Sequence, residues 1–246
     1  MSTFVLKIIA VISMLVDHTV YIFPEYFPYE LRGIIGRLAF PLYAYLIAVG
    51  IEHTKSPMRY LIRLFIFAVI SEPFFDLALK GGSISYLRDT NIFFTLFLGA
   101  SAIYVYKIIF DKLKESPKGK YFIWLGIIPI PVFVYTANLI TTDYAWYGVM
   151  FIISFYFIRK LSNAYIKYFS IFTVTLAQYF VFIPVRLWLP QTQYQLSLIA
   201  GFLIASVLLC LYNEKLGFNK IKWFFYAFYP GHLLILFLIK THITTA

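Results

Sequence analysis

The sequence predicts an all-α polytopic membrane protein, because it is strongly apolar and its apolar residues fall in long runs. Of the 246 residues, 61% are hydrophobic and 13% are charged, whereas soluble domains average about 25% charged residues. A soluble domain of this length cannot bury so much apolar surface, because a folded monomer keeps a large share of its area in contact with water. High hydrophobicity also rules out a disordered chain.

About nine transmembrane helices are expected, because a helix needs roughly 20 apolar residues to cross about 30 Å of hydrocarbon. The predicted segments are 4–23, 33–52, 59–79, 91–110, 121–140, 144–160, 165–184, 195–213 and 223–240. The fifth segment contains Pro129 and Pro131, which predict a kink because proline cannot donate a backbone hydrogen bond. The longest polar stretch is only 111–120, so we expect residues 1–246 to form a single membrane domain.

The basic residues predict the orientation of the chain. Of the 21 lysines and arginines, fourteen lie in or beside the even-numbered connections, and Lys7 is a fifteenth on that side if there are nine helices. The opposite side has five, namely Arg32, Lys80, Arg88, Arg186 and Lys240. Cytoplasmic loops are enriched in Lys and Arg, so we expect the N-terminus in the cytoplasm and the C-terminus outside. The same rule explains the net charge of +10 without nucleic-acid binding.

Several kinds of chemistry are disfavoured by the residue types present. The single cysteine, Cys210, allows neither an intramolecular disulfide nor a Cys-rich metal site. Two of the four histidines, His53 and His242, are expected at water interfaces, so no zinc hydrolase and no metal are expected. The sequence has no Walker A, GxGxxG, HExxH or GxSxG motif, which disfavours a nucleotide-driven pump. The first apolar run is too long for a secretory signal and is expected to be the first membrane helix.

Asp17 and His18 are adjacent ionisable residues inside the first predicted helix, where such residues are costly and indicate function by default. A histidine can take up and release a proton near neutral pH, and a nearby carboxylate can orient its ring. The alternative is a polar clamp that only joins helices. We favour a functional role, because two adjacent ionisable residues are a costly way to join helices.

Four more polar residues fall in the outer half of the predicted helices or at their outer ends: Arg37, Glu72, Asn91 and Asp143. Arg37 stays charged and needs a carboxylate, a carbonyl group or an anionic ligand, so it could simply pair with Asp17 or Glu72. Asn91 could cap the fourth helix, and Asp143 could cap the sixth. The other interpretation is that all four contact a substrate.

His232 lies midway along the last predicted helix, directly after Pro230 and Gly231, where the helix is expected to bend. A lone histidine in a membrane helix is often only a hydrogen-bond partner, but the predicted bend favours a functional role. Together with the outer-half polar residues, His232 could line one cavity that opens to the outside. This convergence is a prediction, because the residues come from separate helices.

Six segments in order cover nearly the whole chain. They are KIIAVISMLVDHTVYIF at 7–23, RGIIGRLAFPLYAYLIAVG at 32–50, YLIRLFIFAVISEPFFDLAL at 60–79, NIFFTLFLGA at 91–100, TTDYAWYGVMFI at 141–152 and KWFFYAFYPGHLLIL at 222–236. Together they resemble the TraX family, membrane proteins named for the acetylation of conjugative pilin. The family also looks like part of a wider group of membrane acyltransferases.

The resemblance implies a multi-pass acetyltransferase of the bacterial cytoplasmic membrane that uses acetyl-CoA as acyl donor. The positions that match the family's motif residues are Asp17, His18, Arg37, Glu72, Asn91, Asp143 and His232. The acceptor is left open, since it could be a peptide, a glycan or a cell-wall polymer.

For this reaction we expect His18 to be the general base and Asp17 to orient it or support its charge. His232 is the rival base or a second proton carrier, and Arg37 or Asn91 would hold the thioester carbonyl or the acceptor. The phosphates of CoA should stay at the basic cytoplasmic face. The residues expected to bind them are Lys55, Arg59, Arg63, Arg159, Lys160 and Lys222. The pantetheine arm would then pass between helices toward His18.

Two other functions fit the sequence less well. A proton-coupled transporter could use the same buried Asp, Glu, His and Arg residues. Transporters often contain inverted repeats, however, and no internal repeat is evident here. A scaffold or assembly factor would not need so many ionisable groups in the outer half of the membrane. We therefore favour the acetyltransferase.

Overall fold

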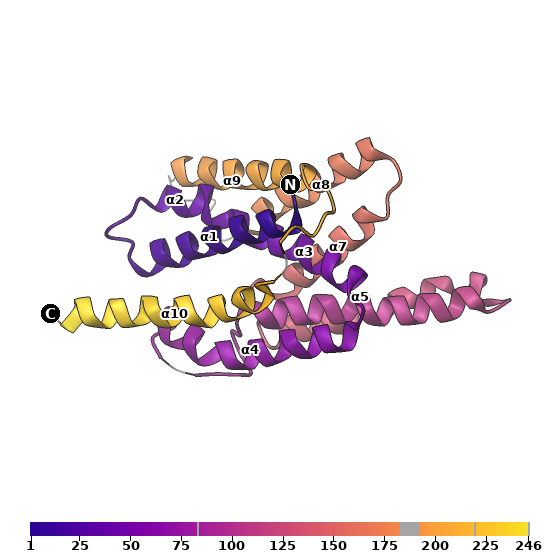
Figure 1. The fold of residues 1–246 in the computed structure, drawn as a ribbon, viewed down its shortest axis with the longest axis horizontal. Coiled ribbons are helices and arrows are strands. Elements are labelled where there is room, and N and C mark those ends of the chain that lie inside the picture. Colours follow the sequence, from indigo (N-terminus) through magenta and orange to yellow (C-terminus); the bar gives the residue numbers. More distant parts are fainter. Residues whose placement is uncertain (83, 183–191, 219, 246) are drawn as a thin grey trace. The chain divides into compact units, whose positions relative to one another are not determined.

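Helices are the regular elements throughout the part of the chain that the computed structural model describes, which is residues 1–82, 84–182, 192–218 and 220–245 (Figure 1). This follows from the apolar sequence, because a backbone in lipid must satisfy its own hydrogen bonds and a helix does so within one segment. Arg186 and the end of the predicted segment 165–184 lie outside the described residues.

Each of the nine predicted segments contains an α-helix over most of its length or over part of it. The α-helices are α1 (Thr3–Ile22), α2 (Tyr29–Ile34), α3 (Ala39–His53), α4 (Pro57–Leu79), α5 (Ile92–Glu115), α6 (Ile130–Leu139), α7 (Ala145–Arg159), α8 (Ala164–Phe182), α9 (Thr192–Cys210) and α10 (Lys222–Thr245). Short 3₁₀ turns are η1 (Gly36–Leu38), η2 (Gly119–Tyr121) and η3 (Ile123–Ile127). The protein is thus an all-helical membrane protein.

Five segments in the described residues are both long and apolar enough to cross a membrane. They are Thr3–Ile22, Tyr29–His53, Ile92–Glu115, Gln193–Cys210 and Lys222–Ile243. Two shorter apolar segments are Trp124–Leu139 and Ala145–Arg159. The number of membrane crossings and the sides on which the termini lie remain predictions.

Two predicted segments differ from continuous helices. The second begins earlier than expected, at Tyr29, and η1 interrupts it between α2 and α3. The fifth is divided into η2, η3 and α6, and α6 begins directly after its N-cap, Pro129. This agrees with the kink expected there, because proline fits the start of a helix but disrupts its interior.

The helices form two compact units. The first unit comprises Met1–Leu46, Pro73–Ile84 and Ile158–Ala246, and the second comprises Ile47–Glu72 and Ser85–Phe157. In the first unit α1 lies beside α2, η1 and α10, and α9 lies beside α2 and α8. In Figure 1 α1 and α10 run side by side within this unit.

Small residues allow helices of the first unit to approach closely. A Cβ atom added at Gly33 of α2 would lie 1.9 Å from the Ser197 Oγ atom of α9, and one at Gly201 would lie 2.2 Å from the Gly33 carbonyl oxygen. Contacts of this kind are typical of membrane helix pairs, whose association depends on close packing. They fix α2, which holds Arg32, against α9.

The N-terminus is held by the connection between α9 and α10. The backbone N–H groups of Thr3 and Phe4 donate to the carbonyl oxygens of Lys215 and Leu216, at 2.8 and 3.1 Å. The Thr3 and Tyr212 hydroxyl groups are 2.8 Å apart. These bonds join the start of α1 to the chain just before α10, the two helices that contain His18 and His232.

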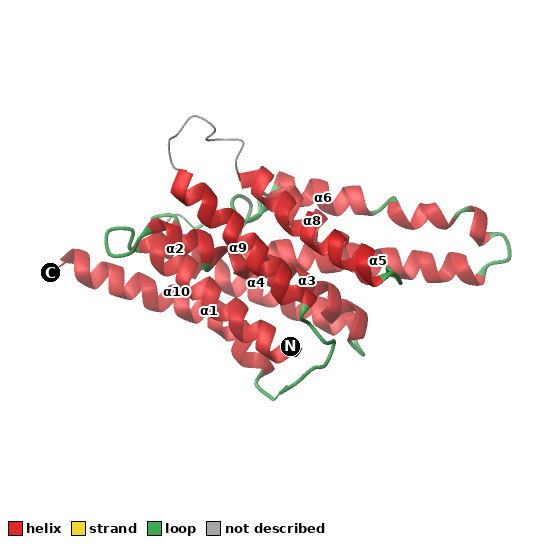
Figure 2. Cartoon of the chain, turned by 90° about the horizontal axis from the view of Figure 1, so that it is seen from above, coloured by secondary structure: helices red, strands yellow, loops and turns green. Residues whose placement is uncertain are grey.

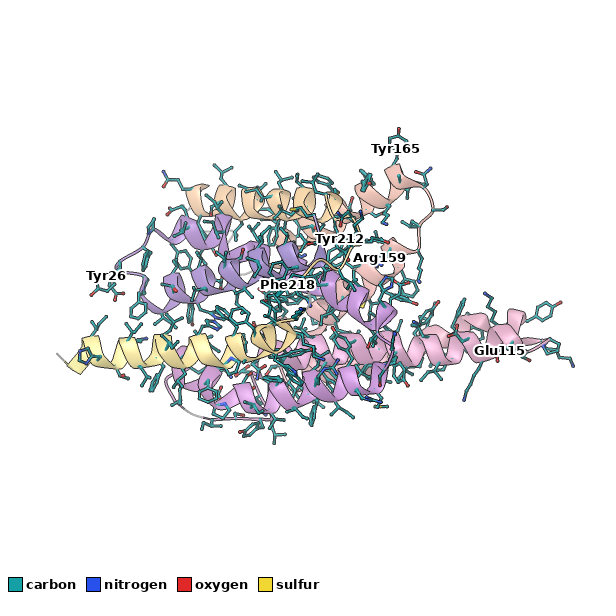
Figure 3. The ribbon with its side chains drawn as sticks, viewed as in Figure 1. Tyr26, Glu115, Arg159, Tyr165, Tyr212 and Phe218 are labelled. Carbon is teal, nitrogen blue, oxygen red and sulfur yellow. The ribbon has the colours of Figure 1, made fainter. Side chains whose placement is uncertain are left out.

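The second unit contains a long helical hairpin. Helix α5 extends to Glu115, and η2, η3 and α6 return along it (Figure 2). Figure 3 labels Glu115 at the tip of this hairpin. Near the base, Gly99 of α5 packs against Ile152 of α7, whose Cδ1 atom would lie 2.6 Å from an added Cβ atom.

Candidate functional site

A histidine pair joins α1 to α10 within the first unit. His18 Nδ1 and His232 Nε2 are 2.7 Å apart, although 214 positions separate the two residues in sequence. His232 is buried, with 5% of its surface exposed, whereas His18 is intermediate in exposure. Both histidines were predicted site residues, and the structure brings them into direct contact.

The main chain of α10 holds the second histidine. His232 Nδ1 lies 2.8 Å from the carbonyl oxygen of Phe228, one helical turn earlier. The Phe228 ring packs against the His232 ring with centroids 4.9 Å apart, and the buried Tyr229 ring packs edge-on against both histidines. Pro230 lies inside the continuous helix α10. The imidazole of His232 is therefore fixed by the helix that carries it.

Asp17 makes an ion pair beside the histidines. Arg32 Nε lies 3.0 Å from Asp17 Oδ1, and Arg32 Nη2 lies 3.3 Å from Asp17 Oδ2. Arg37 Nη1 is 3.9 Å from Asp17 Oδ1. Because an arginine can bind a carboxylate with two parallel hydrogen bonds, Arg32 fixes the orientation of this carboxylate. The predicted pairing of Arg37 with Asp17 is present, but Arg32 is the closer partner.

The Asp17–arginine group depends on a glycine. A Cβ atom added at Gly36 would lie 2.7 Å from Asp17 Oδ1 and 3.0 Å from Asp17 Cα. Only glycine therefore allows η1, which contains Arg37, to lie directly against α1.

Arg32 is a site residue that the sequence did not reveal, since it was counted among the loop charges of the outer side. Its guanidinium lies 4.8 Å from the Tyr21 ring centroid, and its Nη1 atom donates to the Tyr29 hydroxyl at 2.6 Å. Cation–π contacts of this kind favour an arginine over an aromatic face. The one available signal was the cluster of tyrosines around it. Figure 3 places Tyr26 in the neighbouring α1–α2 connection.

A second polar group lies in the second unit, between α4 and the start of α5. Asn91 Nδ2 donates to Glu72 Oε2 at 2.5 Å and to the Ala68 carbonyl oxygen at 2.7 Å. The backbone N–H of Asn91 also donates to Glu72 Oε2, at 3.0 Å. Asn91 Oδ1 accepts from the backbone N–H of Phe93 at 2.9 Å, so Asn91 is the N-cap of α5. Both amide protons of Asn91 are used inside the protein, which favours the capping interpretation.

Asp143 lies in a strained turn before α7. Its backbone N–H donates to the Thr90 carbonyl oxygen at 2.7 Å, and its carbonyl oxygen accepts from the Thr95 hydroxyl. Thr141, Tyr144 and Ala145 have φ of 43°, 71° and 39°. Non-glycine residues in this left-handed region cost about 1 kcal/mol or more each, and such residues cluster at functional sites. The strained backbone of this turn was not recognised from the sequence.

The seven predicted site residues thus form two groups, one in each unit. Asp17, His18, Arg37 and His232 belong to the first unit. Glu72, Asn91 and Asp143 belong to the second. The convergence of all seven on one cavity stays a prediction. Among the described residues, no group of three or more His, Cys, Asp or Glu is placed to hold a metal ion.

The predicted phosphate-binding residues differ in their surroundings. Arg159 is occupied, since its guanidinium lies 3.3 Å from Glu214 Oε1 and 3.4 Å from the Tyr45 hydroxyl (Figure 3 labels Arg159). Lys222 lies over the Trp223 ring. By contrast, the Arg63 Nε–H is buried and has no hydrogen-bond partner in the structure as described. The Arg63 guanidinium also lies over the Tyr60 ring, with its central carbon 5.9 Å from the ring centroid.

The family model described as TraX protein matches residues 2–240, which is nearly the whole chain. The chain belongs to the TraX family. The resemblance expected from the six sequence segments is therefore confirmed.

A curated relative is similar to part of this TraX-family chain. It is the "Probable fimbrial assembly protein FimC, serogroup H1" of Dichelobacter nodosus, 33% identical over 112 residues. The match covers 42% of this chain and 46% of the relative, so the chain spans about half the length of that protein. No solved structure matches the chain.

Proposed function

We propose that this TraX-family protein is a membrane-embedded acetyltransferase. It transfers the acetyl group of acetyl-CoA to an amine or hydroxyl acceptor at the outer half of a bacterial cytoplasmic membrane. The observation that carries the proposal is the His18–His232 pair beside the Asp17–Arg32–Arg37 group. A proton acceptor and fixed positive charges are the two elements that acyl transfer from a thioester requires.

The reaction needs one proton carrier and one stabiliser of negative charge. The acceptor nitrogen or oxygen attacks the thioester carbonyl carbon while its proton passes to the His18 ring. A new C–N or C–O bond forms, and the oxyanion that develops is stabilised by an arginine. The C–S bond then breaks, and the CoA sulfur takes the proton from His18. Acetylated acceptor and free CoA are the products.

The polar groups of the two units have different parts in this proposal. Arg37 is the stabiliser we favour, because both amide protons of Asn91 are already donated to the Ala68 carbonyl oxygen and to Glu72 Oε2. Asp17 holds the arginines, and Glu72 holds Asn91 at the start of α5. The unpaired Arg63 Nε–H supports phosphate binding at the start of α4, together with Arg59 of the same helix and Lys55 of the connection before it.

A protein subunit of a fimbria or pilus is the first acceptor to test. The curated relative is named as a fimbrial assembly protein, and the resemblance of the six segments to the TraX family implies pilin acetylation. Such a subunit offers an N-terminal amine or a hydroxyl group at the membrane surface. A glycan or a cell-wall polymer would react by the same chemistry.

The test is donor binding followed by transfer, with the full chain purified in detergent. Calorimetry should give saturable binding of acetyl-CoA that weakens with dephospho-CoA, because the 3′-phosphate contributes charge-assisted hydrogen bonds. Absence of binding to folded protein would overturn the proposed donor. A labelled acetyl group should then appear on a pilin-type peptide or another acceptor.

His18→Ala should lower the transfer rate by about 10²–10⁴-fold, the usual contribution of a general base. The matched control is His53→Ala, since His53 is an exposed histidine that lies outside both groups. Equal turnover in the two variants would remove His18 from the mechanism.

A further inference from the structure

The contact between His18 and His232 is an edge-to-edge hydrogen bond. Their ring planes are within 5° of parallel and their centroids are 5.0 Å apart. Parallel rings in face-to-face contact are separated by roughly 3.5 Å, the contact distance between carbon atoms. Two nitrogens 2.7 Å apart are closer than such a stack permits. The rings therefore meet at their edges, with the Nδ1 and Nε2 nitrogens facing each other.

The proton on His232 is placed by the backbone of α10. A carbonyl oxygen can only accept, so at 2.8 Å from the Phe228 carbonyl it is His232 Nδ1 that donates. A neutral imidazole carries one N–H, which leaves His232 Nε2 as an acceptor. The hydrogen in the 2.7 Å bond must then come from His18 Nδ1.

We infer that His232 is a positioning residue that holds His18 in the Nδ1–H tautomer and so makes His18 Nε2 the atom that takes the proton from the acceptor. The structure separates the two histidines, which the sequence left as rivals, by their environment. His232 is buried and both of its ring nitrogens are engaged, whereas His18 is partly exposed and keeps one ring nitrogen for chemistry.

This arrangement also serves the charged form of the base. When His18 Nε2 gains a proton, the ring becomes a cation and its Nδ1–H becomes a stronger donor to His232 Nε2. The sequence suggested Asp17 for this task, as in triads where a carboxylate orients the histidine. Here Arg32 engages both Asp17 carboxylate oxygens, and a neutral imidazole orients His18 instead.

The first test is spectroscopic and does not need catalysis. The full chain, labelled with ¹⁵N-histidine and held in lipid nanodiscs, contains only four histidines, and single substitutions assign their ring signals. At a pH where the pair is neutral, His18 should have a protonated Nδ1 and an unprotonated Nε2. The opposite tautomer in the unmodified protein would overturn the inference.

Two substitutions at His232 separate its two hydrogen bonds. In His232→Gln the side-chain oxygen can occupy the position of Nε2 and still accept from His18. In His232→Asn the amide can replace Nδ1 and still donate to Phe228, but His18 loses its acceptor. His18 should keep the Nδ1–H tautomer in the glutamine variant. In the asparagine variant the proton should move to Nε2 in much of the protein. An unchanged His18 tautomer in His232→Asn would contradict positioning by His232.

The catalytic part of the inference rests on the proposed function and has its own measurement. His232→Asn should lower kcat for acetyl transfer by about 10²-fold or more while KM for acetyl-CoA is kept, because a general base in the wrong tautomer loses much of its effect. His232→Gln should keep most of the kcat of the unmodified protein. The matched control, His242→Asn, alters an exposed histidine of the same helix. Its kcat should equal that of the unmodified protein.

The outcomes distinguish this inference from the proposed function. If the kcat of His232→Asn equals that of the unmodified protein, the positioning role of His232 is wrong, but the proposed acetyltransferase activity is not contradicted. If the unmodified protein transfers no acetyl group, the proposed function fails, and the nitrogen spectra still decide whether His232 sets the tautomer of His18.

Discussion

At the scale of single residues, ionisable groups within predicted membrane segments are matched to specific partners. Asp17 is held by Arg32, His18 by His232, and Glu72 by Asn91. Such matching is expected, because a polar group without a partner in a low-dielectric interior costs several kcal/mol. A hydrogen-bond partner can therefore serve to hold a helix in place as well as to support a reaction. Thus the Glu72–Asn91 bonds lie at the start of α5, whereas the bond between His18 and His232 joins α1 to α10.

Glu72 offers a residue-scale prediction about stability. In Glu72→Ala, Asn91 loses the acceptor for its backbone N–H and for one amide hydrogen, so we expect about 1–3 kcal/mol of destabilisation. Glu72→Gln keeps a carbonyl oxygen and should lose distinctly less. Thermal unfolding in detergent measures both. If the Tm of Glu72→Ala equals that of the unmodified protein, the Glu72–Asn91 pair does not stabilise α5.

At the scale of elements, close approaches between helices place the functional side chains. Gly36 brings η1 against α1, and Gly33 brings α2 against α9. Arg32 of α2 and Arg37 of η1 both approach the Asp17 carboxylate. Helix α10 contributes differently, since its own main chain fixes His232 through Phe228.

Gly36→Ala is the prediction at this scale. The added methyl group would lie 2.9 Å from the Asp17 Cβ atom, so η1 or α1 must shift, at a cost of about 1–3 kcal/mol. The Asp17–Arg37 distance should increase, and acetyl transfer should fall with it.

The matched control for Gly36→Ala is Gly231→Ala in α10. A Cβ atom at Gly231 meets nothing within 4 Å, and alanine is favoured over glycine in a helix by about 0.5–1 kcal/mol. The Tm of this variant should stay the same or rise. Equal Tm and activity in the two alanine variants would argue against a close contact at Gly36.

At the scale of the whole molecule, charge and helix count together predict a topology. Basic residues gather in alternate connections, and nine crossings put the two termini on opposite sides of the membrane. The α5–α6 hairpin, with Glu115 at its tip, would then extend from the cytoplasmic side (Figure 3). The same predicted topology would put Arg63 near the cytoplasmic side.

Cysteine labelling can test this topology, because Cys210 is the chain's single cysteine. In a Cys210→Ser background, Tyr26→Cys and Lys118→Cys place reactive thiols at two exposed positions that three predicted crossings separate. An impermeant maleimide added to intact spheroplasts should label position 26, and position 118 only after lysis. Labelling of both positions from the same side would contradict the predicted crossings between them.

The sequence by itself determined the class, the helical segments and the family. Apolar runs long enough to cross a bilayer can only be helices, because each must satisfy its own backbone hydrogen bonds in lipid. The six segments were specific enough for the TraX assignment, which the family match over residues 2–240 confirms. Local effects were also predictable, such as the break at Pro129 and the possible capping role of Asn91.

Only the tertiary structure decided which polar residues meet. Asp17 pairs chiefly with Arg32, and His18 meets a histidine 214 positions away. The sequence could not predict these contacts, because helices that are apolar on every side give no sign of which face turns inward. Their rotation is set by close packing at small residues such as Gly36, a feature that depends on three-dimensional fit rather than on composition.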